Sequence, residues 1–224
     1  MKILDEIFNN YRSDKGSMFG AKHNYSSFYE TLFFHIRNDK FNLLEIGIQE
    51  GYSIKSWLDY FSKAKIFAVD RDIHLNHKTI LQNDRVKFYY GEAESINFDS
   101  SVKFKVIIDD ADHGLDTQQT LLRKYFPKLK KNGFYIIEDL FVGKLPWGAN
   151  ASIKKNFGLL YYLGEYQSPN EGFFPKFIQD IAFLNRLNLC HDILEILKSN
   201  NHFITVSSIS KNGGLHLSLI IFKL

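Results

Sequence analysis

Short apolar runs alternate with amphipathic segments through the middle of the chain. Five runs have the length and composition of buried strands, and they cover residues 42–47, 65–70, 86–92, 105–110 and 133–139. Segments 51–61 and 117–129 carry apolar residues at helical spacing, and the basic run at 128–133 is interpreted as a helix end leading into a turn. The repeated strand-helix order predicts an α/β fold with a parallel sheet and right-handed crossovers.

The C-terminal part departs from this repeat. Residues 178–200 have a helical pattern, and two alternating runs at 202–210 and 215–224 flank the turn K-N-G-G at 211–214. Two such runs around a glycine turn predict an antiparallel β-hairpin. A parallel sheet closed by a C-terminal hairpin resembles the Rossmann-like sheet of class I methyltransferases. We therefore expect a single domain over residues 1–224.

Two segments lie outside the predicted sheet. Residues 1–40 are rich in Tyr, His and Phe, and we expect them to form an N-terminal helical arm packed over the sheet edge. Residues 141–177 contain three of the four prolines, five glycines and many aromatic residues. Because this irregular segment follows an acidic strand end, it is interpreted as a substrate lid.

The composition is that of a globular protein without a strong charge bias. Hydrophobic residues make up 45% of the chain and the formal net charge is +3, so no nucleic-acid partner is indicated. The single cysteine, Cys190, excludes a disulfide framework and a cysteine-based zinc site. The early charges do not fit a signal peptide, and no apolar run approaches the roughly 20 residues of a membrane span. We therefore expect a cytoplasmic protein with no membrane partner.

The segment L-L-E-I-G-I-Q-E-G-Y-S at 43–53 combines a strand, a tight turn and a helix start. Gly47 and Gly51 let the backbone approach a ligand closely, although glycines are also ordinary in turns. The spacing E-x-G-x-x-x-G differs from the G-x-G-x-x-G of dinucleotide sites. Acidic residues here, with Glu45 inside the strand, repel phosphate but suit a ligand with an ammonium group.

Two further carboxylates follow the next strands. Asp70 ends the second strand, where it can accept both ribose hydroxyls, and Glu92 follows the third, where an adenine-side contact is expected. With Glu45, acidic residues thus stand at three successive strands. This arrangement favours S-adenosylmethionine (SAM) over a dinucleotide as the cofactor.

A second acidic group follows the last two parallel strands. The runs K-V-I-I-D-D-A-D-H at 105–113 and F-Y-I-I-E-D-L at 134–140 both end in carboxylates. Neighbouring strand ends would bring Asp110, Glu138 and Asp139 close enough to share a divalent cation, with His113 beside them. The plainer interpretation is that these are solvated turns and helix caps, with Asp116 capping the following helix.

At this point the motifs resemble a known family. The segments Y-R-S-D-K-G-S-M-F-G-A-K-H-N-Y, L-L-E-I-G-I-Q-E-G-Y-S, I-I-D-D-A-D-H, Y-F-P-K-L-K-K-N-G and Y-I-I-E-D-L occur in the order found in macrocin and mycinamicin sugar O-methyltransferases. The resemblance covers residues 11–140. It implies an enzyme, a SAM- and Mg²⁺-dependent transferase that methylates a sugar hydroxyl.

The resemblance also implies roles for individual residues. The metal ligands of the family fall on Asp110, Glu138 and Asp139, and its general base falls on His113. The family motif usually reads D-D-G-S-H, whereas this chain has D-D-A-D-H with the additional Asp112. The metal ligand among Asp109, Asp110 and Asp112 therefore stays open, with strand parity and the D-x-x-H spacing favouring Asp110.

The arm carries polar residues inside an apolar pattern. In the resembling family the arm folds over the cofactor, which implies SAM contacts for Ser13, Lys15, His23 and Tyr25. The alternative is structural, with Asp14 and Lys15 forming a surface pair and Tyr25 capping the core.

Other functions stay open. A phenol O-methyltransferase of the catechol type would more often use a lysine base, and a hydroxylase-type relative would need an iron triad, whereas one histidine accompanies the acidic cluster. A non-catalytic SAM-binding protein is the remaining alternative. The expected partner is a sugar-containing small molecule, either a nucleotide-activated sugar or a glycosylated natural product, and the resemblance implies a homo-oligomer.

Overall fold

A computed structural model of the chain describes residues 3–20, 22–74, 77–139, 190–209 and 215–224. The chain divides into two compact units, Met1–Ile108 and Asp109–Leu224.

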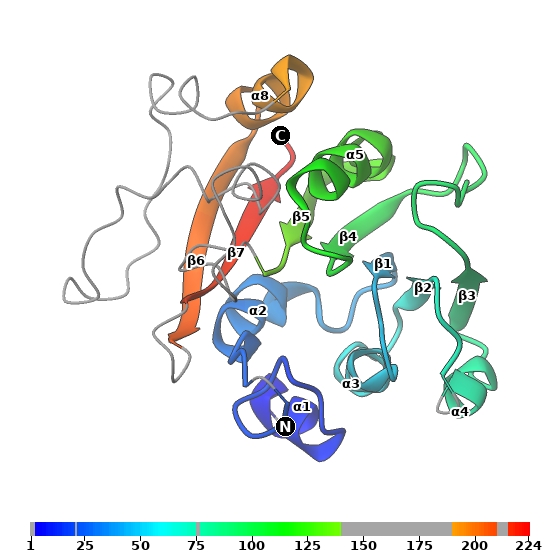
Figure 1. The fold of residues 1–224 in the computed structure, drawn as a ribbon. Helices are drawn as coiled ribbons and strands as arrows, with labels where there is room; N and C mark the ends of the chain where they lie inside the picture. The colour runs from blue at the N-terminus through cyan, green and yellow to red at the C-terminus, as the bar shows by residue number, and fades with distance from the viewer. Residues whose placement is uncertain (1–2, 21, 75–76, 140–189, 210–214) are drawn as a thin grey trace, which may run out of the picture. The chain divides into compact units, whose positions relative to one another are not determined.

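A seven-stranded sheet organises the fold, with the strand order β3-β2-β1-β4-β5-β7-β6 (Figure 1). The first strands β1, β2 and β3 pair in parallel, whereas β5 with β7 and β6 with β7 pair antiparallel. The strands are β1 Asn42–Ile46, β2 Lys65–Asp70, β3 Val86–Tyr90, β4 Phe104–Asp109, β5 Leu129–Ile137, β6 Asn201–Ile209 and β7 Leu215–Phe222. The predicted fold class, a parallel sheet closed by a C-terminal hairpin, is confirmed.

The first unit contains the arm and the helices that follow β1 and β2. These elements are α1 Leu4–Asn10, α2 Ser26–Phe33, the 3-10 helix η1 Phe34–Ile36, α3 Tyr52–Tyr60 and α4 His77–Leu81. Helix α1 packs against α2 and α3. Rings of the arm surround Trp57 of α3, with ring centroids 5.0 Å away for Phe8, 5.2 Å for Tyr29 and 5.9 Å for Phe33. The predicted helical arm is therefore present, and aromatic packing attaches it to α3.

The second unit contains α5 Leu115–Tyr125, the 3-10 helix η2 Phe126–Lys128, and α8 His191–Lys198 beside β5, β6 and β7. Helices α5 and α8 are joined by the Arg123–Asp192 ion pair, and the Cys190 amide donates to Gln119 Oε1 at 2.8 Å. Contacts between residues about 70 positions apart in the sequence thus hold α5 and the start of α8 together.

The interpretation of residues 128–133 as a helix end and turn was wrong. Strand β5 already begins at Leu129. The Asn132 amide donates to the Lys223 carbonyl at 2.8 Å, and the Lys223 amide donates to the Gly133 carbonyl at 3.0 Å. Pairing with the distant C-terminal strand therefore overrides the local basic, turn-like pattern.

Several sequence predictions fall outside the described residues. They are the lid at 141–177, the part of the helical region at 178–189 and the turn at 211–214. Among the helices that the structure describes, none has the length and apolar character needed to span a membrane.

Candidate functional site

The glycine turn after β1 has an unusual backbone. Gly47 and Gly51 have φ values of 80° and 75°, in the left-handed region that glycine tolerates. Gln49 between them also has a positive φ, 44°, which is costly for a residue with a side chain. The turn therefore requires support from neighbouring groups.

Asp70 at the end of β2 provides part of that support. Its Oδ2 accepts the amides of Ile48 and Gln49, both at 2.8 Å, and its Oδ1 accepts the Asp72 amide at 2.9 Å. A carboxylate offers about four acceptor positions, so little capacity remains for a ligand. Asp70 thus supports the turn, and its contact with ribose hydroxyls stays a prediction.

Glu45 and Lys15, both predicted to contact the cofactor, contact each other. Lys15 Nζ lies 3.5 Å from Glu45 Oε1, and the two side chains are 3% and 0% exposed. The Trp57 indole also donates to Glu45 Oε2 at 2.9 Å. The surface pair of Asp14 and Lys15 is therefore not formed, because Lys15 is buried against β1.

The other predicted cofactor residues are divided between core and surface. Ser13 and Tyr25 are buried, and the Tyr25 amide pairs with the Lys15 carbonyl at 2.8 Å. The His23 ring lies 5.1 Å from that of Tyr25, and its Nε2 is 3.6 Å from Asp14 Oδ2. Glu92 is exposed after β3. The predicted cofactor residues of the arm are thus buried, whereas Glu92 is exposed and lies far from them in the sequence.

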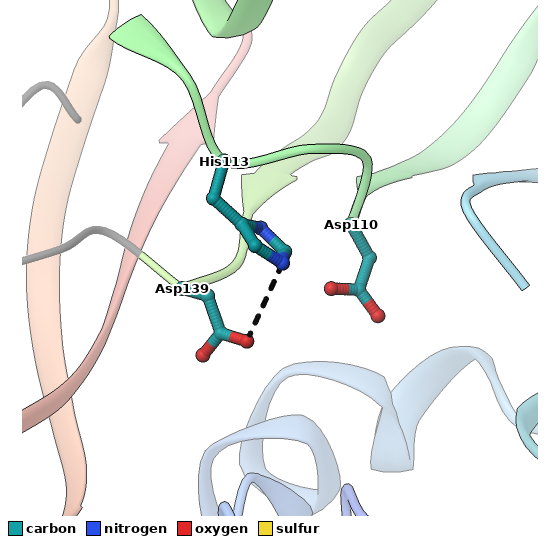
Figure 2. Close-up of side chains that lie close together, drawn as sticks. All are labelled: Asp110, His113 and Asp139. Atoms are coloured by element: carbon teal, nitrogen blue, oxygen red, sulfur yellow. Dashed lines mark ion pairs between the residues drawn. The ribbon is translucent and has the colours of Figure 1, made fainter. Parts of the chain in front are cut away.

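In the second unit, a cluster of acidic and histidine side chains lies just after the ends of β4 and β5. One ligand-type atom from each of Asp110, His113 and Asp139 lies within 4.8 Å of the other two (Figure 2). His113 Nε2 is 3.9 Å from Asp139 Oδ2, and both side chains are partly exposed. A cation could therefore reach all three groups from solvent.

The backbone explains this convergence. The Glu138 amide donates to the Asp109 carbonyl at 2.9 Å, so the residues that follow β4 and β5 begin side by side. His113 and Asp139 both have left-handed conformations, with φ values of 61° and 49°. These turns direct the two side chains toward Asp110 (Figure 2).

Glu138, predicted as a metal ligand, is not in this cluster. It is 1% exposed, and its carbonyl accepts from Gln118 Nε2 at 3.5 Å. Among the described residues the structure groups His113, rather than Glu138, with the two aspartates. The role of Glu138 as a ligand stays a prediction.

The neighbours of Asp110 have other partners. Asp109 is buried and accepts from the Tyr135 hydroxyl at 3.3 Å. Burial raises the pKa of Asp109 to about 8, and the Asp110 carboxylate adds to the increase, while hydrogen bonds from Ala111 and Tyr135 oppose it. Asp109 is therefore buried against Tyr135 and is not part of the cluster found among the described residues.

Asp112 stabilises the start of α5 with two hydrogen bonds. Its Oδ1 accepts the Gly114 amide at 2.9 Å and its Oδ2 accepts the Thr117 hydroxyl at 3.0 Å. Gly114 occupies the N-cap position, so the alternative that placed Asp116 there was wrong. Of the three candidate aspartates, Asp110 is the one that faces the cluster.

Sequence reasoning missed His77 of α4. Its Nε2 lies against the Gln49 carbonyl in the glycine turn, and its side chain is buried. The only local signal was a histidine just after the acidic end of β2, which is too common to indicate a contact 28 residues away.

Comparisons with known proteins find sequence relatives of this chain. The chain is 31% identical over 167 residues to a tetracenomycin rhamnosyl 3'-O-methyltransferase of Streptomyces olivaceus, covering 69% of this chain and 41% of that protein. It is 30% identical to the L-olivosyl-oleandolide 3-O-methyltransferase of Streptomyces antibioticus, covering 64% and 38%. The mycinamicin VI 2''-O-methyltransferase of Micromonospora griseorubida is 25% identical, over 64% and 37%. The chain thus spans about two fifths of the length of these relatives.

Solved structures share the fold. The methyltransferase MycE of the mycinamycin pathway, crystallised with Mg and S-adenosylhomocysteine (SAH), matches 99% of this chain and 53% of its own, with a TM-score of 0.59 and 18% identity. A 1,6-didemethyltoxoflavin N1-methyltransferase of Burkholderia thailandensis covers 99% and 87%, with a TM-score of 0.57 and 14% identity. No protein-family model matches the sequence. The resemblance drawn from the motifs is confirmed: this chain is a sequence relative of the macrocin and mycinamicin sugar O-methyltransferases, with the fold of class I methyltransferases.

Proposed function

We propose that the protein transfers a methyl group from SAM to a sugar hydroxyl with the help of Mg²⁺. The observation that carries the proposal is the cluster of Asp110, His113 and Asp139 at two strand ends. Similarity to methyltransferases of rhamnosyl and olivosyl units supports a sugar as the acceptor. A glycosylated natural product or a nucleotide-activated sugar fits this class.

The glycine turn has the features that a SAM site requires. Gly47 and Gly51 keep side chains away from the turn, and Asp70 fixes two of its amides. Asp70 retains capacity for one hydroxyl, and Glu92 is exposed after β3. Bound at these residues, SAM supplies an already activated methyl group, so the chain has to position the acceptor rather than create a leaving group.

The donor set of the cluster fits a divalent cation. Asp110 and Asp139 offer hard oxygen atoms, which Mg²⁺ prefers, and their partial exposure leaves space for water and for substrate oxygens. Glu138 adds a carboxylate at the neighbouring position in the sequence. Mg²⁺ held there would supply the positive charge that makes a hydroxyl more acidic.

His113 is the base in this proposal. A neutral imidazole at this position accepts the hydroxyl proton at Nε2, and Asp139 Oδ2, 3.9 Å away, stabilises the resulting positive charge. The partial exposure of the ring gives an acceptor access to it.

The test is a methylation assay with purified protein, SAM, Mg²⁺ and a panel of nucleotide-activated sugars, glycosylated macrolides and catechols. SAH release and the mass of the product identify the acceptor class. We expect methylated sugar, loss of activity with EDTA, and a rate reduced about a hundredfold or more in His113→Ala. His191→Ala is the matched control, since that side chain is 87% exposed on α8.

The alternatives give different results. Full turnover with EDTA and in His113→Ala would contradict the metal and histidine mechanism. Methylation of catechols alone would favour the phenol O-methyltransferase. SAM binding without methyl transfer to any acceptor would favour a non-catalytic protein.

A further inference from the structure

His77 is a buried histidine that the proposed reaction does not use. It opens the short helix α4, and it is 1% exposed. Its Nε2 lies within hydrogen-bonding distance of the Gln49 carbonyl, and its Nδ1 lies 3.4 Å from the His74 amide nitrogen. Both ring nitrogens therefore face backbone groups.

These contacts define the state of the ring. A carbonyl oxygen only accepts hydrogen bonds, so Nε2 must carry the proton that the Gln49 carbonyl receives. The His74 amide only donates, so Nδ1 must be unprotonated. His77 is thus neutral with its proton on Nε2, and it acts as a directed donor to the turn.

The residue that receives this bond is the strained one. Gln49 has a φ of 44°, and its amide donates to Asp70 Oδ2 at 2.8 Å. Asp70 therefore fixes the amide side of Gln49, and His77 fixes its carbonyl side. Two groups from outside the turn hold a conformation that a non-glycine residue rarely adopts.

A second residue of α4 supports the same turn. A Cβ added to Gly51 would stand 2.1 Å from Ile80 Cδ1 and 3.5 Å from His77 Cδ2. Ile80 is 2% exposed, so it has little room to move away. Helix α4 thus packs directly on the turn through both of these side chains.

We propose that His77 is a positioning residue for the cofactor, which sets the affinity for SAM by holding Gln49 and hence the glycine turn in its binding conformation. The inference rests on the proposed function, because it takes the turn as the SAM site. In this proposal the hydrogen bond from Nε2–H sets the affinity for SAM. The ring itself contributes packing, with its centroid 5.1 Å from that of Phe88.

The experiment is calorimetric titration of the full chain with SAH, combined with thermal unfolding of each variant without ligand. His77→Phe keeps a ring but has no donor, and His77→Gln restores an N–H near the Nε2 position. We expect the dissociation constant to rise about tenfold in His77→Phe, as for one lost buried hydrogen bond, and to stay within about threefold of wild type in His77→Gln. If His77 contributed only packing, His77→Gln would not bind SAH more tightly than His77→Phe.

His35→Phe is the matched control, since it makes the same replacement at an exposed position of the same unit, in η1. SAH affinity in this variant is expected to equal that of wild type.

Nuclear magnetic resonance of the imidazole nitrogens in the wild-type protein gives a test that needs no variant. Protonated Nε2 and unprotonated Nδ1 support the inference even if His77→Phe does not fold, and a proton on Nδ1 overturns it. Unchanged SAH affinity in His77→Phe, or no recovery in His77→Gln, also overturns it. If wild type does not bind SAH, the proposed function fails and this inference fails with it.

Discussion

Asp112 shows how a single residue can support a site without belonging to it. Its two carboxylate oxygens hold Gly114 and Thr117 at the start of α5, directly after His113. His113 adopts its left-handed conformation within this turn. In the resembling family this position is usually serine, which can accept the same kind of hydrogen bond at a helix start.

Replacing Asp112 tests this role. Asp112→Ala is expected to destabilise the protein by about 0.5–2 kcal/mol and to lower the rate of methyl transfer, because His113, the proposed base, loses its fixed orientation. Asp112→Ser should recover most of both. Urea unfolding and the initial rate of SAH formation measure the two effects, with the exposed Asp116→Ala as the control. An unchanged rate in Asp112→Ala would show that the turn does not position His113.

The Lys15–Glu45 pair is the second residue-scale feature. Removing one partner leaves a charge in the core, whereas replacing both does not. Lys15→Met is therefore expected to lower the free energy of unfolding by roughly 3 kcal/mol or more, and the double variant Lys15→Met/Glu45→Gln by less. Urea unfolding measures both, and Lys65→Met, at an exposed position, is the control. A double variant as unstable as Lys15→Met alone would argue against charge burial as the cause.

At the scale of elements, the ion pair between α5 and α8 links stability to pH. The hydrogen bond and charge of Arg123 lower the pKa of Asp192 in the folded protein. A carboxyl group with a lowered folded pKa stabilises the fold above its unfolded pKa of about 3.9, and this contribution is lost as the pH falls through the folded value. The link between α5 and α8 should therefore weaken in acid.

Arg123→Ala tests this pH dependence. Because both side chains are about half exposed, we expect a loss of only about 0.2–1 kcal/mol at pH 7. Near pH 2 the difference between the variant and wild type should be smaller than at pH 7, because protonation of Asp192 removes its charge as the pH falls through the lowered folded pKa. Urea unfolding at the two pH values gives the comparison, and a stability difference that persists undiminished in acid would contradict the assignment to this pair.

The element pattern explains which parts of the fold could be predicted. Strand β2 occupies the predicted residues 65–70, because its apolar run and acidic end are both local signals. The early start of β5, at Leu129, could not be predicted, since the first half of this strand pairs with Lys223 through Asn132 and Gly133. The support of the start of α5 by Asp112 was missed for a similar reason, because several acidic residues lie near this start and only the turn geometry selects Asp112.

At the scale of the molecule, the candidate site was predictable where it depends on strand order. Asp110 and Asp139 follow β4 and β5, which are neighbours in the sheet, so their proximity follows from the topology. The contacts of His77 with the turn and of Lys15 with Glu45 join residues 28 and 30 positions apart. Such contacts depend on how helices and the arm pack, which no local pattern encodes.

The central claim is a methyl transfer that depends on a cation at the acidic cluster. The most direct measurement is the initial rate of SAH formation, with the acceptor found in the panel, as a function of Mg²⁺ concentration. Wild type should be inactive after EDTA treatment and recover with Mg²⁺. Asp110→Asn should need at least about tenfold more Mg²⁺ for half its maximal rate, and the exposed Asp116→Asn should match wild type. A wild-type rate that is the same with EDTA as with Mg²⁺ would contradict the account.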